Sequence, residues 1–265
     1  MAPDILLLDS ITDARADARG RLVVCGSHGG LFPAAVAARA QVRAVLFNDA
    51  GIGLDRAGVV GVVALESVGM AAVALDCHSC RIGSADDALA RGIVSVVNAV
   101  AVDLGVTAGM TAEIALDLLG KAAPPSGQLA TISEARKSIV FGPNNLRIQL
   151  LDSASLVNDS DRGEIVITGS HGGLIGGDAL RALKADARLA VFNDAGFGMD
   201  DCGVTRLAAL DARDIAALTV ASETARIGDA ASALESGVIS RVNRAAGAMG
   251  ATVGVRLNRY LIPRG

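Results

Sequence analysis

Aromatic residues are scarce in this chain, and the scarcity limits how its interior can be built. Phe, Tyr and Trp make up 2% of the 265 residues and Trp is absent, whereas hydrophobic residues as a whole make up 51%. The chain therefore has ample apolar material for a buried core, and we expect that core to consist mainly of Ala, Val, Leu and Ile.

Long apolar runs, a basic leader and basic clusters are also missing. No uncharged apolar run approaches the roughly 18 residues of a membrane-spanning helix, so we expect a soluble protein with no membrane partner. The start, Met1-Ala2-Pro3-Asp4, lacks the basic region of a signal peptide. A net charge of −4 with scattered Arg residues argues against nucleic acid. The expected partner is a small-molecule substrate, or another copy of the chain in a homo-oligomer.

Cysteine and the common nucleotide-binding motifs are equally sparse. Four cysteines do not make a disulfide framework in a chain of this size, so a reducing, cytoplasmic location is expected. The glycine-rich turns described below lack the Lys-Ser/Thr of a P-loop and the spacing of the dinucleotide fingerprint. ATP and NAD are therefore unsupported, and we expect no cofactor and no metal.

What the chain does contain is a repeat. Gly26-Ser27-His28-Gly29-Gly30 recurs at 169–173, and Phe47-Asn48-Asp49-Ala50-Gly51 recurs at 192–196. When residues 47–107 are aligned with 192–252, 26 of 61 positions are identical. This identity is far above the roughly one in ten expected from composition, and it indicates a tandem duplication. We place a first repeat at 1–109, a linker with a helix at 110–143, where Pro124-Pro125 breaks the helix, and a second repeat at 144–265.

Each repeat alternates short apolar runs with helical stretches. Expected strands lie at 21–25, 44–47, 72–75 and 93–96, and in the second copy at 164–168, 189–192, 217–220 and 238–241. Strands that alternate with helices form parallel sheets with both faces covered. The predicted fold class is α/β, a tandem duplication of a Rossmann- or flavodoxin-like parallel-sheet unit that forms an internal pseudo-dimer.

The repeated motifs fall where strands end and helices begin, which is where α/β sheets bind ligands. Glycines there allow a sharp turn, and backbone N–H groups of the next helix can bind an anion. The alternative is a strand–helix turn that binds nothing. The substrate-binding candidates in these turns are Ser27, Gly29, Gly30, Ser170, Gly172 and Gly173.

Histidine gives the strongest functional signal. The chain has three histidines, and His28 and His171 occupy the same turn in the two copies. Imidazole is well suited to proton transfer near neutral pH, so both are candidate general acids or bases.

A carboxylate follows the next strand in each copy. Asp49 and Asp194 could orient these histidines as catalytic residues, and Asn48 and Asn193 could donate to a substrate carbonyl or oxyanion. Equally, Asp could cap the next helix and Asn could form a turn.

Arginine is repeated as well, within Arg81-Ile82-Gly83 and again at 226–228. Arg81 and Arg226 could clamp a substrate carboxylate, or they could form a salt bridge between the halves.

The copies differ at 76–80, where the first copy reads Asp76-Cys77-His78-Ser79-Cys80 and the second has no cysteine. Cys80, or Cys77, could be a nucleophile activated by a histidine. Zinc binding by Cys77, His78 and Cys80 would need cramped spacing, and simple packing is at least as good an interpretation.

Together these features predict an enzyme that acts on a small polar metabolite bearing a carboxylate or amide, through His-based acid/base chemistry. We expect a hydrolase of a C–N bond. A lyase or isomerase of the same substrate class, and a non-catalytic small-anion binding protein, are the alternatives.

Overall fold

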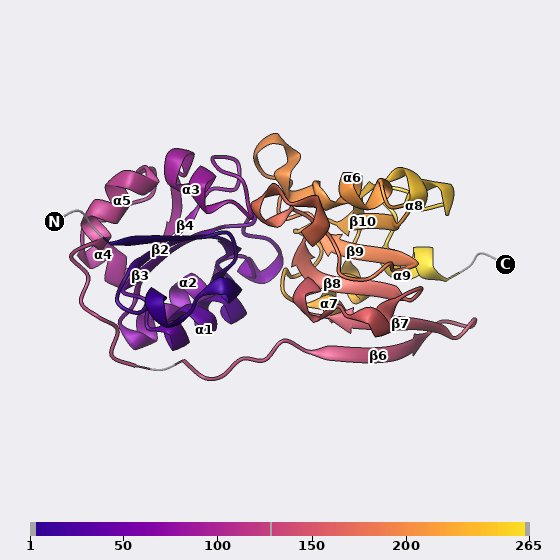
Figure 1. Ribbon diagram of the computed structural model, residues 1–265, viewed down its shortest axis with the longest axis horizontal. Coiled ribbons are helices and arrows are strands. Elements are labelled where there is room, and N and C mark those ends of the chain that lie inside the picture. Colours follow the sequence, from indigo (N-terminus) through magenta and orange to yellow (C-terminus); the bar gives the residue numbers. More distant parts are fainter. Residues whose placement is uncertain (1–3, 128, 263–265) are drawn as a thin grey trace.

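The computed structural model describes residues 4–127 and 129–262, and it has two halves, each built on one sheet (Figure 1). The first sheet has the strand order β1-β2-β3-β4-β5 and the second β11-β10-β9-β8-β7-β6. Most strand pairs are parallel. The protein is therefore of the α/β class, with two parallel-dominated sheets of similar size.

The first half contains the elements that the repeat predicts, together with an added edge strand. Its strands are β1 (Ile5–Leu8), β2 (Leu22–His28), β3 (Ala44–Asn48), β4 (Ala71–Leu75) and β5 (Val94–Val97). Its α-helices are α1 (Leu31–Ala40), α2 (Val60–Ala64), α3 (Ala85–Arg91), α4 (Ala99–Asp103) and α5 (Ala112–Leu119).

The second half has the same order of strands, and one further strand, β6, precedes them and forms a hairpin with β7. Its strands are β6 (Arg136–Phe141), β7 (Leu146–Leu151), β8 (Ile165–His171), β9 (Leu189–Asn193), β10 (Ala216–Val220) and β11 (Ile239–Val242). Its α-helices are α6 (Arg206–Asp211), α7 (Ala230–Ser236), α8 (Arg244–Ala248) and α9 (Leu257–Leu261).

Both faces of each sheet are buried, which explains the continuous apolar strands. Val23 and Cys25 of β2 pack with α1 and α2 on one face, whereas Leu22 and Val24 pack with α3 and α5 on the other. Ala, Val, Leu and Ile dominate these clusters, and the largest fully buried side chains are Phe47 and Phe192.

The last strand of each half differs from the expectation of a wholly parallel sheet. β5 runs antiparallel to β4, and β11 runs antiparallel to β10. The chain leaves β4 at its carboxyl end, forms α3 beside β1 and β2, and returns to pair Val94 with Leu75 at that same end. The strand order is sequential and never reverses, so the likeness to Rossmann or flavodoxin units is limited to the alternation of strands and helices.

The halves also differ after the Ser-His-Gly-Gly turn. The first half forms α1 there, but the second half forms 3₁₀ turns at Ile175–Gly177 and Ala179–Arg181. Gly176 and Gly177 have φ angles of +61° and +69°, which an α-helix cannot contain. This segment is therefore available to line a cavity instead of covering the sheet.

The stretch 110–143, assigned to the linker, contributes to both halves. α5 packs in the core of the first half through Ala112, Ala115, Leu116 and Leu119. β6 pairs with β7 at the edge of the second sheet. The connection between them runs along one side of the molecule (Figure 1).

Loops after β3 and β9 join the halves in a nearly symmetrical way. Leu54 N–H donates to the carbonyl of Ser222 at 2.8 Å, and Met199 N–H donates to the carbonyl of Cys77 at 2.8 Å. A Cβ on Gly51 would lie 2.8 Å from the Cα of Gly196. Glycine is required at this contact because the two backbones touch.

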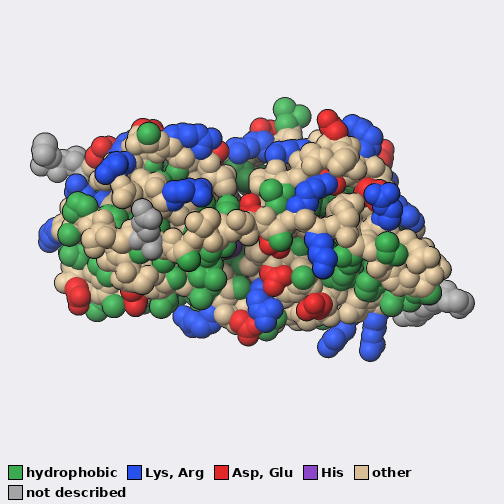
Figure 2. Space-filling view, turned by 90° about the horizontal axis from the view of Figure 1, so that it is seen from below, with side chains coloured by type: hydrophobic (Ala, Val, Ile, Leu, Met, Phe, Trp, Pro, Cys, Tyr) green, Lys and Arg blue, Asp and Glu red, His purple; other side chains and the backbone are tan. Residues whose placement is uncertain are grey.

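No helix within 4–127 or 129–262 combines the length and the apolar character needed to cross a bilayer. Acidic and basic side chains are interspersed on the face shown in Figure 2, with no single basic patch.

Candidate functional site

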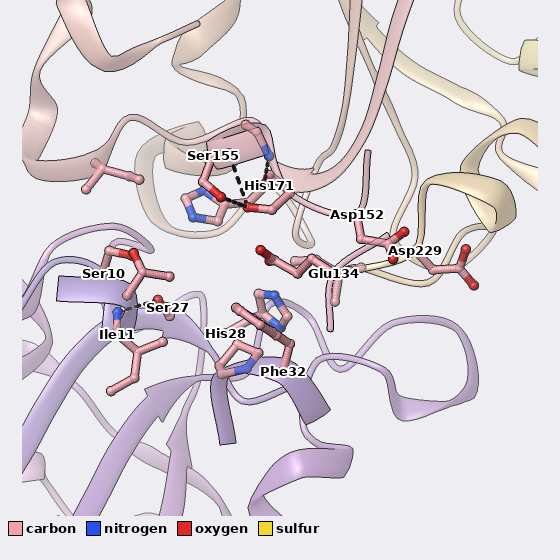
Figure 3. A pocket seen from close by; sticks show the side chains of 18 of the residues that line it. Ser10, Ile11, Ser27, His28, Phe32, Glu134, Asp152, Ser155, His171 and Asp229 are labelled. Atoms are coloured by element: carbon pink, nitrogen blue, oxygen red, sulfur yellow. Dashed lines mark hydrogen bonds between the residues drawn. The ribbon is translucent and has the colours of Figure 1, made fainter. Parts of the chain in front are cut away.

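A cavity of about 710 Å³ lies between the two halves, and it brings the repeated histidines together (Figure 3). It is lined by the ends of β2 and β8, the loops after β1 and β7, and residues 132–134 of the connecting segment. Its size is in the range of ligand sites.

Each histidine is held through its Nδ1 atom by a neighbouring backbone N–H. Gly30 N–H donates to Nδ1 of His28 at 3.1 Å, and Gly173 N–H donates to Nδ1 of His171 at 3.2 Å. Nδ1 is therefore the acceptor, and the proton of the neutral ring is on Nε2. A Cβ on Gly30 would lie 2.7 Å from the His28 ring, so glycine is needed for the imidazole to sit over this backbone.

Both imidazoles are neutral at physiological pH. Burial lowers the pKa of His28 to about 4. Burial also holds the pKa of His171 well below its ordinary value, and the positive charges of Arg206 and protonated His28 lower it further. Each ring therefore offers the cavity an N–H donor and not a cation.

Glu134 enters the cavity from the connecting segment, and Figure 3 shows its carboxyl group in the same cavity as the two imidazoles. The segment is fixed next to it, because Ala135 N–H donates to a carboxylate oxygen of Asp152 at 2.8 Å and Asp152 N–H donates to the carbonyl of Ala135 at 3.0 Å. Burial raises the pKa of Glu134 to about 7; the charge of Asp152 also raises it, and a hydrogen bond from Ser153 opposes the shift. This carboxyl group can therefore accept or donate a proton at neutral pH.

Serine hydroxyls line the cavity but are not coupled to the histidines. The Oγ of Ser27 accepts from Ile11 N–H at 3.0 Å, and the Oγ of Ser170 accepts from Ala154 N–H at 2.9 Å. Within the described residues no hydrogen bond joins a serine hydroxyl to His28 or His171. The site therefore lacks the serine–histidine couple of a nucleophilic hydrolase.

A buried arginine closes the wall on the side of the second half. Arg206 is 3% exposed. Its guanidinium carbon lies over the ring of Phe192, 5.3 Å from the ring centroid. Its Nε donates to the carbonyl of Gly173 at 2.9 Å, and its Nη1 donates to the carbonyls of Arg181 and Ala182. Burial lowers its pKa to about 10, so the guanidinium stays charged at neutral pH.

The repeated Asn-Asp pairs lie outside the cavity lining and hold loops. Asp49 accepts from the N–H groups of Gly51 and Cys77, each at 3.0 Å, and from the Ser95 hydroxyl at 2.8 Å. Asp194 likewise accepts from the N–H groups of Gly196 and Ser222. In the described parts of the chain, neither carboxylate is hydrogen-bonded to a histidine.

The paired asparagines have the same kind of role. Asn48 accepts from Ala50 N–H at 2.9 Å and donates to the carbonyl of Cys80. Asn193 likewise accepts from Ala195 N–H and donates to the carbonyl of Ala225. Both asparagines are buried. They shape the turns after β3 and β9.

The cysteine-rich segment is also separate from the cavity. Cys77 and Cys80 are buried, and burial raises the pKa of the Cys80 thiol to about 12 and that of Cys77 as well. Asp49, Asp76 and Cys77 place one ligand atom each within 4.8 Å of the others, but the Asp49 carboxylate already accepts three hydrogen bonds. His78 is exposed and is not part of this group. These residues fit neither a reactive thiolate nor the alternative of a Cys-His zinc site.

The repeated arginines pair across the two halves. Arg81 forms ion pairs with Asp87 and Asp200, and Arg226 pairs with Asp55, its Nε lying 2.8 Å from the carboxylate. Arg226 lines the cavity, whereas Arg81 does not. This is the arrangement of salt bridges between the halves.

The remaining glycines of the turn are packing positions. A Cβ on Gly29 would lie 2.7 Å from a methyl of Val62, and one on Gly172 would lie 2.7 Å from the carbonyl of Gly203. They let the turns after β2 and β8 approach the segments that follow β3 and β9 closely.

The structure thus brings together His28, His171, Ser27, Ser170 and Arg226 from the predicted set. It adds Glu134, Arg206 and Lys184, which the sequence reading missed. Arg206 aligns with Gly61 of the first copy, so comparing the copies at this position could have revealed it. Glu134 lies in the connecting segment, outside the aligned repeat, and carried no such signal.

Comparisons with protein-family models, with curated proteins and with solved structures found no match.

Proposed function

We propose that this chain is an enzyme that catalyses acid/base chemistry on a small anionic carbonyl compound, in the cavity between two duplicated halves that act as an internal pseudo-dimer. The observation that carries the proposal is that the carboxyl group of Glu134, with a pKa raised to about 7, lines the same cavity as two neutral imidazoles. The four cysteines do not form a disulfide framework, and this supports a cytoplasmic location.

In the proposed hydrolytic reaction, Glu134 accepts a proton from water while the water oxygen bonds to an amide carbon. The Nε2–H groups of His28 and His171 donate to the oxyanion that forms. Each neutral imidazole can donate from Nε2, because its Nδ1 atom accepts a backbone N–H group and carries no proton. Protonated Glu134 then gives its proton to the leaving nitrogen as the C–N bond breaks, and the products are a carboxylic acid and an amine.

The same three groups would serve proton transfer at a carbon next to a carbonyl, as in a lyase or isomerase. This second candidate is favoured by the absence of a serine or cysteine coupled to a histidine in the described chain. Glu134 would remove the proton, and the histidine donors would stabilise the enolate.

Substrate screening by proton NMR in D₂O separates the two reactions. A panel of small carboxylic acids, hydroxy acids, primary amides and N-acyl amino acids is incubated with the protein. Hydrolysis yields a carboxylate together with ammonia or an amine, whereas enolisation places deuterium on carbon. We expect one of these outcomes.

Variants then test the assignment of roles. Glu134→Gln should lower kcat by about 100-fold or more, and His28→Asn and His171→Asn should each lower it by a similar factor. Glu113→Gln is the matched control, because Glu113 is an exposed carboxyl on α5. Full activity in Glu134→Gln would overturn the proposal, and binding of a panel compound without any turnover would favour the small-anion binding protein.

A further inference from the structure

The two walls of the cavity differ in chemistry. Every Lys or Arg among its described lining residues comes from the second half: Arg181, Lys184, Arg206 and Arg226. The first half contributes instead an apolar wall at the start of α1 and α2, made by Leu31, Phe32, Pro33 and Val60. A ligand that fills the cavity meets positive charge on one side and hydrocarbon on the other.

Arg206 is the centre of the cationic wall. No carboxylate of the described residues pairs with it, and its Nε and Nη1 atoms donate to backbone carbonyls. Its Nη2 makes no hydrogen bond to the described residues. A buried guanidinium with a free N–H group at a cavity is a site for an anion.

The other charges leave room for that anion. Arg226 pairs with Asp55, whereas both carboxylate oxygens of Asp152 accept backbone N–H groups and pair with neither Arg206 nor Lys184. Lys184 donates to the carbonyl of Ser155 at 2.5 Å and has no carboxylate partner among the described residues. Arg206 and Lys184 thus form no ion pair with the described carboxylates, Glu134, Asp152 and Asp229 of the same cavity included.

Exposed apolar side chains of both halves also line the cavity. Leu31, Val60 and Leu180 line it and are 44%, 37% and 89% exposed. A small polar metabolite would leave these side chains in water, whereas an apolar tail would cover them.

We infer that the ligand is a carboxylate with an apolar tail, its head held by Arg206 and Lys184 and its tail lying along Leu31, Val60 and Leu180. The inference rests on the proposed function for the reaction, but the binding of such a molecule does not depend on turnover. It revises the expected small polar substrate to an amphipathic one.

Straight-chain carboxylates from butanoate to octanoate test the tail. Their Kd values are measured by NMR titration of the labelled full-length protein. We expect Kd to fall about threefold to fourfold for each added methylene. Leu180→Ser and Val60→Ser should flatten this dependence and leave the Kd of butanoate unchanged. Val140→Ser is the control, since Val140 is 65% exposed on β6 and outside the cavity.

Comparison of hexanoate with hexanamide tests the head. The amide has the same tail without the charge, so we expect its Kd to be at least about tenfold higher in the unmodified protein. Arg206→Gln should abolish this difference and keep the chain-length dependence. If that variant does not fold, Lys184→Gln, which changes an exposed residue, should reduce the difference.

Equal Kd values for hexanoate and hexanamide, or a Kd independent of chain length, would overturn the inference. So would a loss in Val140→Ser equal to that in Leu180→Ser. These results are independent of the proposed reaction, because the Kd values of the series are measured in the unmodified protein without turnover of any compound. If the binding series fails while Glu134→Gln still lowers kcat as expected, the inference is wrong and the proposed function stands.

Discussion

The backbone N–H of Gly30 donates to Nδ1 of His28 at 3.1 Å, and this bond decides which nitrogen of the imidazole can donate to a ligand. Gly173 and His171 repeat the relationship at 3.2 Å in the second half. The glycine is thus part of the site, because the ring lies where a Cβ would be.

Substituting Gly30 by Ala should therefore disturb the histidine. The new Cβ would lie 2.7 Å from the ring, and we expect a loss of about 1 to 3 kcal/mol in the free energy of unfolding. The ¹⁵N shifts of His28 should show a changed tautomer or orientation. Gly247→Ala in α8 is the control, since nothing lies within 4 Å of its Cβ and Ala favours the helix. Equal stability in both variants would show that the turn adapts freely.

Asp49→Ala should destabilise the joint between the halves. It leaves two backbone N–H groups without their acceptor, and the Ser95 hydroxyl keeps only the carbonyl of Ala74. One of the two N–H groups belongs to Cys77, whose carbonyl accepts from Met199 of the other half. We expect a loss of about 3 kcal/mol, measured by denaturant unfolding. Asp159→Ala, which removes an exposed carboxyl, should cost less than about 0.5 kcal/mol. Similar small losses in both would contradict the structural role of Asp49.

Stability should fall as the solution is made acidic through the range in which unfolded histidine gains a proton. The native pKa of His28 is about 4, against 6.5 for the ordinary side chain, so between these values the unfolded state binds more protons. The contribution of His28 is therefore absent above about pH 6.5 and becomes destabilising below it. His28→Asn should flatten the dependence of the unfolding free energy on pH between about 4 and 6.5.

Glu134 acts in the opposite sense. Its native pKa of about 7 exceeds the ordinary 4.5, so the native state binds more protons between these values and stability from this group falls as pH rises. Glu134→Gln should therefore make the unfolding free energy fall more steeply as the pH is lowered. His28→Asn should make it fall less steeply. Parallel pH curves for the two variants would contradict this assignment.

The thiols should be unreactive in the folded protein. Cys25, Cys77, Cys80 and Cys202 are all free and buried, and burial raises the pKa of Cys80 to about 12. Ellman's reagent at pH 8 should modify none of them within minutes, and all of them after unfolding. Rapid modification of one thiol in the native protein would revive the nucleophilic reading of Cys80.

Much of this architecture could be predicted from local patterns. The strands that contain Val23, Val45 and Val73 follow from short apolar runs followed by turn residues, because a strand buried on both faces needs little else. The position of His28 and His171 at strand ends followed in the same way. The antiparallel direction of β5 did not, since it depends on where α3 packs rather than on the composition of the strand.

The partners of the site residues lay beyond the sequence reading because they depend on contacts distant in the chain. Asp49 follows the strand next to His28, yet its carboxylate turns towards Cys77 and Ser95, 28 and 46 residues away in sequence. Glu134 reaches the cavity through a connecting segment with no periodic pattern. Arg206 differs from Gly61 at the matching position of the first copy, so the sequence marks it. Its contact with the cavity depends on the second half having no helix that corresponds to α1, which the sequence did not show.

The central claim is that a titrating carboxyl group shares one cavity with two neutral imidazoles, and an NMR titration of protein labelled at Glu ¹³Cδ and His ¹⁵N measures all three groups at once. Glu134→Gln assigns the glutamate signal. We predict that Glu134 titrates near pH 7, and that His28 and His171 remain neutral with the proton on Nε2 down to about pH 5. A Glu134 pKa near 4.5 together with histidine pKa values near 6.5 would contradict the account.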